Sequence, residues 1–462
     1  MTPVMGVRRR RKTWARSLAA IAAVLAWGPL GAVQEPAAAA MIARAESFVD
    51  LLSSQQFSKA VAQFDAAMKA ALSEDRLKAT WTGLVAQAGP FKQRIGVRTE
   101  QRGTVYAVLV TCQFERARQD VQVAFNPAGE VIGLSIRPSP EVAPAGAEYI
   151  PPSYAIPGSY REREVTVGGA DWPLPGTLTL PAATPSTPSA PAVVLVHGSG
   201  PNDRDETIGP NKPFRDLAHG LASQGIAVLR YDKRTRVHAA RLAGLTTFTV
   251  KDEVIDDALA AVELLRKEPG IDAARIVVLG HSLGGMLVPR IAAADSRIAG
   301  FIVMAGAAKS LEDAIMAQML YLSYADGTVS PDEQKALDDV QKFVDTIRAL
   351  TPATAVAGNI GGAPASYWLD LKGYDPPAVA RVITRPMLVL QGERDYQVPL
   401  EDFTRWKSAL SSRSQVTLRS YPALNHLFIE GTGPSLPTEY KMPGHVAEVV
   451  VRDITAWMRT IK

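Results

Sequence analysis

The stretch Arg275-Ile-Val-Val-Leu-Gly-His-Ser-Leu-Gly-Gly285 joins a short apolar strand to an apolar helix through a Gly-x-Ser-x-Gly turn. The glycines that flank Ser282 permit a sharp turn in which a side chain would collide with neighbouring backbone. Such a turn holds the serine hydroxyl clear of the sheet and aims the N-terminus of the next helix toward it. We therefore predict that Ser282 is a catalytic nucleophile; the alternative is a plain glycine-rich turn.

Short apolar strands alternate with helices on both sides of this turn, from about residue 161 to the last residue, 462. We expect strands at 193–196, 226–231, 275–279, 298–304, 387–390 and 416–421, and helices at 214–223, 254–266, 283–294 and 445–461. This alternation predicts an α/β fold with a mostly parallel, doubly wound sheet covered by helices on both faces. Active sites in such sheets form at the carboxyl ends of the strands, so the loops that follow the strands should carry the chemistry.

A serine hydroxyl needs a base to take its proton, and histidine is the usual one. The sequence holds six histidines. His426 lies in Leu424-Asn-His-Leu-Phe428, just after the last expected strand, and we predict that it is the base. His281 adjoins the serine inside the turn and is interpreted as structural. Ordinary roles on a helix and in a basic loop are expected for His219 and His238. His445, at the start of the last helix, is expected either to line the rim of the site or to cap the helix.

The base in turn needs a carboxylate that fixes its tautomer and stabilises the imidazolium. The strand at 387–390 runs into Gln391-Gly-Glu-Arg-Asp-Tyr-Gln-Val-Pro399, which offers two acids. We predict Asp395 as the acid partner, with Glu393 as the rival. The chain order Ser282, Asp395, His426 is the order found when a Gly-x-Ser-x-Gly nucleophile is part of a triad.

Two backbone N–H groups should stabilise the oxyanion that forms when a serine attacks a carbonyl. The N–H of Leu283, immediately after the nucleophile, is one expected donor. The other is the N–H of Ser199, in the loop Val196-His-Gly-Ser-Gly-Pro201, whose glycines allow close approach of backbone to a ligand. We expect Asp203, Arg204 and Asp205 to brace this loop by ion pairing, and we expect no metal site.

At this point the resemblance to a known superfamily is plain. Residues 161–462 resemble the α/β-hydrolase superfamily in three motifs that occur in order, at 197–201, 280–285 and 392–399. The stretches 197–206, 231–234 and 424–428 resemble an exported bacterial subgroup of serine esterases and dienelactone-hydrolase-like proteins. The resemblance implies a carboxylic-ester hydrolase that works through a Ser-His-Asp triad and an acyl-enzyme on a small-molecule ester, without a cofactor.

About eighty residues, 306–385, separate the strand at 298–304 from the strand at 387–390, which is too long for an ordinary connection. Helical patterns at 311–324 and 331–350 predict a helical cap over the active site. Four aromatic side chains are expected either to line an acyl or alcohol pocket or to pack the core of the cap: Tyr321, Tyr324, Tyr367 and Trp368. The substrate-binding residues themselves remain unknown at this stage.

The first forty residues have the pattern of a secretory signal peptide: a cationic run, an apolar stretch and small residues ending at Ala40. They contain six basic residues and one acid, so the net charge of +4 belongs to this leader and the remainder is near neutral. We therefore expect an exported protein, periplasmic or secreted, without a stable membrane anchor and without a nucleic-acid partner. An uncleaved anchor is the alternative.

Residues 41–138 are expected to form a small α+β domain, with helices at 45–52 and 57–72 and strands at 104–114, 121–125 and 131–136. This unit resembles the small domain DUF3887, and no group of residues in it predicts chemistry. The single cysteine, Cys112, excludes an intramolecular disulfide and is interpreted as a buried structural thiol. Residues 138–160 contain six prolines, and residues 139–160 are expected to be a linker.

Three other functions stay open beside ester hydrolysis. A serine peptidase or amidase of the prolyl-oligopeptidase-related branch would use the same triad on an amide. A thioesterase or acyltransferase would use the same acyl-enzyme with a different donor or acceptor. A binding protein with vestigial catalysis would keep the fold alone, and the complete order of serine, acid and histidine argues against it. The oligomeric state is not predicted.

Overall fold

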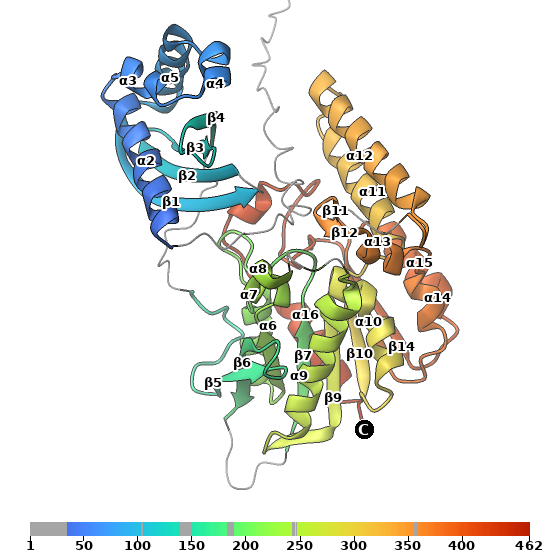
Figure 1. Cartoon of the computed structure of the whole chain (residues 1–462). Coiled ribbons are helices and arrows are strands. Elements are labelled where there is room, and N and C mark those ends of the chain that lie inside the picture. Colours follow the sequence, from blue (N-terminus) through green and yellow to red (C-terminus); the bar gives the residue numbers. More distant parts are fainter. Residues whose placement is uncertain are drawn as a thin grey trace, which may run out of the picture. The chain divides into compact units, whose positions relative to one another are not determined.

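The computed structural model describes residues 35–102, 105–138, 149–182, 189–242, 245, 247–354 and 359–462. These residues form two compact units (Figure 1). One comprises the described residues before Ile150 together with those of 238–245, and the other comprises the rest of the chain from Ile150 on. Most of the expected signal peptide, residues 1–34, lies outside the described residues. Among those that are described, no helix combines the length and hydropathy needed to cross a membrane.

The first unit packs helices on one antiparallel sheet. Its sheet has the strand order β1-β2-β3-β4, with strands Phe91–Arg102, Val105–Phe114, Arg118–Phe125 and Val131–Pro138. Its helices are α2 (Glu35–Ser53), α3 (Phe57–Ala62), α4 (Ala66–Ala71) and α5 (Glu74–Ala88). Apolar side chains of α2, α3 and α5 form one core with those of β2 and β3. The unit is thus an α+β domain.

Cys112 lies in this core without exposed surface. Burial, with the nearby Asp120 carboxylate, raises the pKa of the Cys112 thiol to about 12. The thiolate is the reactive form of cysteine, so this thiol is not a nucleophile near neutral pH.

The expected helix at 57–72 is two helices, because the chain turns at Phe64. The Phe64 side chain is buried and its backbone pairs with Val131. Asp65 then starts a new helix, since its carboxylate accepts a hydrogen bond from the Met68 N–H at 2.7 Å. The helix α5 and the strand β1 were not expected from the sequence.

The second unit contains an eight-stranded sheet of order β14-β13-β10-β9-β7-β8-β6-β5. Its strands are β5 (Tyr160–Val167), β6 (Leu174–Pro181), β7 (Ala190–Val196), β8 (Ala227–Tyr231), β9 (Ile271–His281), β10 (Gly300–Met304), β13 (Met387–Gly392) and β14 (Val416–Tyr421). The six strands from β7 onward are parallel, whereas β5 and β6 pair antiparallel at one edge. The predicted α/β fold with a mostly parallel sheet is confirmed.

Helices cover both faces of this sheet (Figure 1). On one face α6 (Pro213–Ser223) and α16 (Glu448–Met458) share a core with every second residue of the central strands. On the other face α9 (Asp256–Arg266) and α10 (Leu283–Ala294) pack on β7, β9 and β10. Because both faces are covered, the central strands are apolar throughout.

The unit begins earlier than the expected boundary at residue 161. Tyr154 donates a hydrogen bond to the Val446 carbonyl at 2.6 Å, and the Ile156 N–H donates to the Ser223 hydroxyl at 2.9 Å. Residues 150–159, which were expected in the linker, therefore pack on α6 and on the start of α16. Most of the remaining linker, 139–148, lies outside the described residues.

The insertion between β10 and β13 is largely helical. It contains the paired helices α11 (Leu311–Ser323) and α12 (Pro331–Ala349), a short hairpin of β11 (Asn359–Ile360) and β12 (Ala363–Pro364), and the helices α13 (Ala365–Leu371) and α14 (Pro376–Ala380). Its aromatic side chains divide into two groups. Tyr367 and Trp368 are buried, whereas Tyr321 and Tyr324 keep exposed surface.

Candidate active site

Ser282 occupies the turn between β9 and α10, with φ of 54° and ψ of −116°. Only glycine adopts a positive φ without strain, so the surrounding structure must hold this serine in place. The Ser282 N–H donates to the Met304 carbonyl of β10 at 3.0 Å, which fixes the turn to the adjacent strand. The residues on either side are buried while Ser282 is half-buried. The turn therefore leaves the Ser282 side chain partly accessible between two buried neighbours.

The two glycines of the motif are required by close backbone contacts. A Cβ at Gly280 would overlap the carbonyl oxygen of Gly284, and a Cβ at Gly284 would overlap the carbonyl oxygen of Val196. The turn thus packs directly on the end of β7. This contact brings the loop after β7 next to the nucleophile.

His426 and Asp395 form a buried pair. The His426 Nδ1 lies 2.7 Å from Asp395 Oδ2, and both side chains are almost fully buried. The other carboxylate oxygen, Oδ1, accepts hydrogen bonds from the N–H groups of Gln397 and Val398 at 2.8 and 2.9 Å. These bonds hold the carboxylate in one orientation. The carboxylate in turn favours the imidazole tautomer that carries its proton on Nδ1 and leaves Nε2 free to accept a proton.

The rival acid lies elsewhere. Glu393 is exposed, and its carboxylate accepts a hydrogen bond from the Ser420 hydroxyl at 2.7 Å. The structure therefore pairs His426 with Asp395 and leaves Glu393 on the surface.

His281 connects this pair to the nucleophile turn. Its Nε2 lies 3.0 Å from the His426 carbonyl oxygen, and the two rings are 4.7 Å apart. Since His281 directly precedes Ser282, the predicted base and the predicted nucleophile belong to neighbouring segments. Among the described residues, the Ser282 hydroxyl forms no hydrogen bond to His426. Catalytic hydrogen bonds are often long in a free enzyme and tighten when substrate binds.

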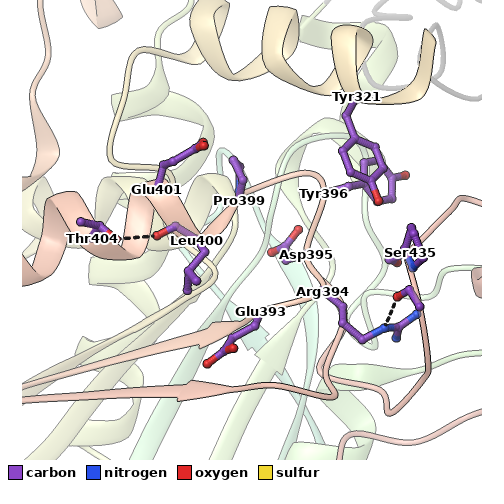
Figure 2. A pocket seen from close by; sticks show the side chains of 12 residues that line it. Tyr321, Glu393, Arg394, Asp395, Tyr396, Pro399, Leu400, Glu401, Thr404 and Ser435 are labelled. Carbon is purple, nitrogen blue, oxygen red and sulfur yellow. Dashed lines mark hydrogen bonds between the residues drawn. The ribbon is translucent and has the colours of Figure 1, made fainter. Parts of the chain in front are cut away.

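A pocket of about 650 Å³ is lined by the loop that carries Asp395, including Asp395 itself (Figure 2). Tyr321 of α11 stacks on Tyr396 there, with ring centroids 5.3 Å apart. Neither Ser282 nor His426 lines this pocket. Of the four aromatic residues predicted for the cap, Tyr321 contributes to a pocket wall, while Tyr367 and Trp368 pack in the interior.

The two predicted oxyanion donors are available. Leu283 is the first residue of α10, so its N–H has no acceptor within the helix. The Ser199 N–H has no acceptor among the described residues. The neighbouring Gly198 lies against the nucleophile, because a Cβ on it would be 3.0 Å from the Ser282 Cβ. The structure thus brings both predicted donor residues to the segments that surround Ser282.

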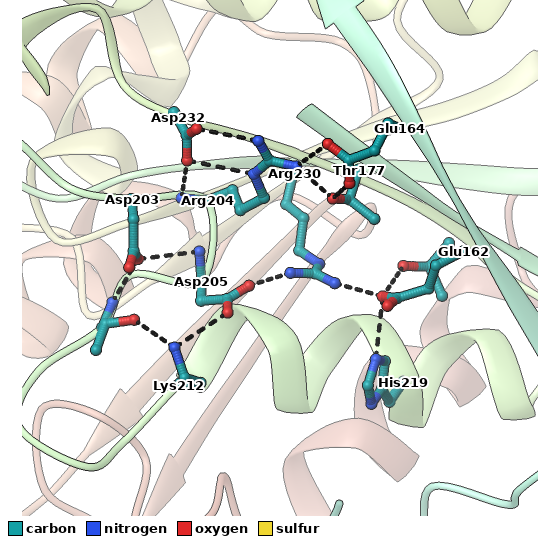
Figure 3. A network of polar contacts seen from close by, with 12 residues as sticks. Glu162, Glu164, Thr177, Asp203, Arg204, Asp205, Lys212, His219, Arg230 and Asp232 are labelled. Carbon is teal, nitrogen blue, oxygen red and sulfur yellow. Dashed lines mark hydrogen bonds and ion pairs between the residues drawn. The ribbon is translucent and has the colours of Figure 1, made fainter. Parts of the chain in front are cut away.

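Ion pairs of Arg204 and Asp205 brace the loop after β7, as expected from the sequence (Figure 3). The Asp203 carboxylate forms no ion pair among the described residues and accepts hydrogen bonds from backbone N–H groups of the same loop instead. Arg204 donates to Asp232 and to Glu164, which ties the loop to β5 and to the end of β8. Asp205 pairs with Lys212 at 3.3 Å and with Arg230. Arg230 in turn reaches Glu162, which also accepts from His219. The loop is therefore fixed to the edge strands.

This network predicts a pH-dependent contribution to stability from Glu162. Burial alone would raise its pKa, but the hydrogen bond from His219 and the charge of Arg230 lower it to about 2 from 4.5. A carboxylate with a lowered folded-state pKa stabilises the fold above the unfolded value, and this contribution is lost as the pH falls toward 2.

We therefore expect Glu162→Gln to reduce the free energy of unfolding by about 1–3 kcal/mol at pH 7. The reduction should shrink steadily below pH 4.5. Urea unfolding of both proteins between pH 7 and pH 3 measures it. A difference that stays constant over this range would contradict the proposed ionic role.

Glu206 links the oxyanion loop to His281. One carboxylate oxygen accepts from the Gly198 N–H at 2.6 Å, and the other lies 2.9 Å from His281 Nδ1. Burial alone would lower the pKa of His281, but the Glu206 carboxylate and the His426 carbonyl raise it above its ordinary value. Burial alone would raise the pKa of Glu206, but His281 keeps it low. Both shifts favour a charged pair between His281 and Glu206.

Backbone strain gathers around these residues. Five non-glycine residues of the described chain have positive φ, and four of them adjoin the site: Glu206, Ser282, Ala305 and Phe428. Ala305 follows the strand that binds the nucleophile turn, and Phe428 stands two residues after the base. Such strain persists only where the surrounding structure enforces it, and it is commonly found at functional sites.

The fold brings together the segments that carry the predicted serine, acid, base and donors. Glu206 lies among them and was not predicted from the sequence. Its only signal was its place in the stretch 197–206, which follows the expected oxyanion loop. Among the described residues, no group of three or more histidine, cysteine or acidic side chains is arranged to hold a metal ion.

Two family models match the chain. The model described as "Protein of unknown function (DUF3887)" matches residues 45–134, and the model of the alpha/beta hydrolase family matches residues 193–435. The second match spans slightly more than half of the chain. Both matches confirm the resemblances seen in the sequence.

The chain is 39% identical to Esterase EstD of Thermotoga maritima over 411 residues, which cover 89% of this chain and 93% of that protein. It is 25% identical to a monoacylglycerol lipase of Mycolicibacterium smegmatis over 288 residues, which cover 60% of this chain and 90% of that protein. Among solved structures, an esterase of Pyrococcus furiosus aligns with a TM-score of 0.40 and 16% identity, covering 66% of this chain and 92% of that one. From the family match and the similarity to Esterase EstD over nearly its whole length, the chain belongs to the alpha/beta hydrolase family.

Proposed function

We propose that this ester hydrolase cleaves carboxylic esters through an acyl-enzyme on Ser282. His426 takes the proton of the Ser282 hydroxyl at Nε2 while Oγ attacks the ester carbonyl carbon. The N–H groups of Leu283 and Ser199 hold the oxyanion of the tetrahedral intermediate. The intermediate collapses, the ester C–O bond breaks, and His426 returns the proton to the departing alcohol.

Water then completes the cycle. His426 takes a proton from a water molecule, whose oxygen attacks the acyl carbon, and the same donors hold the second oxyanion. Collapse releases the carboxylic acid and returns the proton to Ser282. Asp395 stays ionised throughout and stabilises the imidazolium that forms twice in the cycle.

One observation carries this proposal above the others. The buried His426–Asp395 pair, joined at 2.7 Å, stands on the segment that His281 attaches to the strained Ser282 turn. A glycine-rich turn with only a structural role would require neither the strained serine nor an oriented imidazole beside it. The 39% identity to an esterase supports esters as the substrate class.

Export is part of the proposal. The cationic and apolar leader is typical of a signal peptide, and α2 begins at Glu35. Cleavage after Ala40 would remove the first turns of this helix. Expression in a bacterial host followed by N-terminal sequencing of the exported protein tests this part, and recovery of only full-length protein in the cytoplasm would contradict it.

A panel of p-nitrophenyl esters with acyl chains of increasing length, together with the matched p-nitroanilides and thioesters, tests the reaction class. We expect kcat/KM for the best ester to exceed that for its anilide by at least about 100-fold, because the alcohol leaves more readily than the amine. Faster cleavage of anilides would favour the peptidase alternative, and faster cleavage of thioesters would favour a thioesterase. The acyl length at the optimum would report the size of the pocket.

A further inference from the structure

A buried ammonium group lies behind the oxyanion loop. Lys233 follows β8 and is only 2% exposed, although lysine is almost never buried without a partner. Its Nζ donates a hydrogen bond to the Gly198 carbonyl oxygen at 2.7 Å and lies 2.7 Å from a Glu253 oxygen. The same carbonyl also accepts from the Asn202 side chain at 3.2 Å. No step of the reaction above uses this lysine.

The contact with Gly198 determines which way the Ser199 N–H points. The Gly198 carbonyl and the Ser199 N–H belong to one planar trans peptide group, so they point in opposite directions. Because Lys233 holds the carbonyl toward the interior, the N–H is turned away from it. Gly198 lies against Ser282, since a Cβ on it would be 3.0 Å from the Ser282 Cβ. A peptide held in this way can direct the Ser199 N–H toward the nucleophile.

The charge of Lys233 also acts through the peptide. A cation at the carbonyl oxygen draws electron density from the peptide group and makes its N–H a stronger donor. Hydrogen bonds polarise one another in this way most strongly where water is excluded. The flexible glycines on both sides of Ser199 supply no such constraint by themselves.

The lysine is itself held from two further segments. Glu253 is 1% exposed and lies in the π-helical turn Lys251–Ile255 that precedes α9. Its second oxygen accepts a hydrogen bond from the hydroxyl of Tyr367 at 2.8 Å. Tyr367 belongs to α13 of the insertion and is also buried. A continuous chain of contacts thus runs from the insertion to the oxyanion loop.

We propose that Lys233 is a positioning residue of the oxyanion hole, which orients and polarises the Gly198–Ser199 peptide and is held by Glu253 and Tyr367. This inference rests on the proposed function, because it takes the Ser199 N–H as an oxyanion donor. It places a determinant of catalysis in a residue that touches no substrate. It also connects the insertion to the rate of the chemical step.

The test removes the ammonium group without leaving a lone buried carboxylate. The double variant Lys233→Met with Glu253→Gln removes both charges, since an unpaired Glu253 would destabilise the fold. We expect its kcat for the best p-nitrophenyl ester to fall by about 10- to 100-fold with KM within about threefold, because removal of a whole oxyanion donor costs about 10²- to 10³-fold.

A second readout reports on the oxyanion alone. In a thionoester, sulfur replaces the carbonyl oxygen and accepts hydrogen bonds weakly, so an intact oxyanion hole gives a large ratio of oxoester to thionoester kcat. We expect this ratio to fall several-fold in the double variant. A lysine that only stabilised the fold would leave the ratio unchanged.

The neighbouring pair supplies a matched control. Arg234 is also largely buried and pairs with Asp257, one turn beyond Glu253, with Nε 3.1 Å from one carboxylate oxygen. The Arg234 side chain contacts Asp257 and the Trp172 ring, and neither of these residues belongs to the oxyanion loop. The double variant Arg234→Met with Asp257→Asn removes a comparable buried pair without leaving a lone charge. We expect its kcat and its ratio to stay within about twofold of the wild type.

Tyr367→Phe keeps every charge and removes one hydroxyl, so it tests the chain of contacts even if the double variant does not fold. We expect a fall in kcat of about threefold and a smaller ratio. The proposal is wrong if the Lys233 variant and Tyr367→Phe both keep the kcat and the ratio of the wild type, or if the Arg234 control loses both equally. A different result would contradict the proposed function itself: ester hydrolysis that persists in Ser282→Ala.

Discussion

Ser282→Ala is expected to lower kcat for ester hydrolysis by about 10⁴- to 10⁶-fold, because the acyl-enzyme can no longer form. The residual rate would come from the oxyanion donors and from substrate binding, which the substitution leaves in place. The variant should also fold, since the Ser282 hydroxyl makes no hydrogen bond among the described residues. The turn itself depends on the bond from the Ser282 N–H to Met304, which alanine keeps.

Stopped-flow and long-term assays with a p-nitrophenyl ester measure this loss, and thermal unfolding checks the fold. Ser199→Ala is a suitable comparison, because it removes a hydroxyl from the same site while keeping the backbone N–H. We expect its kcat to stay within about threefold of the wild type. Comparable turnover by Ser282→Ala would show that another group is the nucleophile.

His426→Ala is expected to lower kcat by a similar factor of about 10⁴ or more, because it removes the proposed acceptor of the serine proton. Asp395→Asn should cost about 10²- to 10⁴-fold, since the amide disrupts the tautomer that leaves Nε2 free to accept. In the structure Asp395 accepts from His426 and from two backbone N–H groups. An amide nitrogen at either oxygen would oppose one of these donors.

Two variants serve as controls for this pair. Glu393→Gln changes the exposed rival acid, and His445→Ala removes a partly exposed histidine that bonds to Asp216 away from the site. Both should keep kcat within about twofold. A large loss in Glu393→Gln together with full activity in Asp395→Asn would transfer the acid role to Glu393.

The three proposed catalytic residues could be picked out from the sequence because each lies in a short motif directly after an apolar strand. The strand ending at Leu279 precedes Ser282, the strand 387–390 precedes Asp395, and the strand 416–421 precedes His426. Parallel strands bring such loops to one edge of the sheet, so order along the chain translates into proximity. The short motif after each strand was therefore enough to predict these three positions.

The missed parts of the first unit have weaker patterns. The strand β1 is an edge strand in which charged and polar residues outnumber apolar ones, so it lacks the alternation that marks a half-buried strand. The helix α5 did carry a signal, since Ser73 caps it and Leu77 and Trp81 stand one turn apart. The break at Phe64 could not be predicted, because it depends on pairing with Val131, far along the chain.

The contacts that position the oxyanion loop also could not be predicted from the sequence, because they too join residues that lie far apart along the chain. Lys233, Glu253 and Tyr367 come from three separate segments and meet only in the folded unit. As isolated letters they suggest a solvated loop, a helix face and a cap aromatic. Their roles follow from burial, because a buried charge must find a partner and therefore reveals what surrounds it.

The central claim is that Ser282 is the nucleophile, and one labelling experiment tests it most directly. A fluorophosphonate reacts covalently with an activated serine. Cleavage after Arg275 and Arg290 yields the peptide Ile276–Arg290, in which Ser282 is the only hydroxyl-bearing residue. We predict that mass spectrometry finds one adduct per chain, on this peptide, and none in Ser282→Ala. An adduct on another peptide of the active protein, or labelling that persists in Ser282→Ala, would contradict the account.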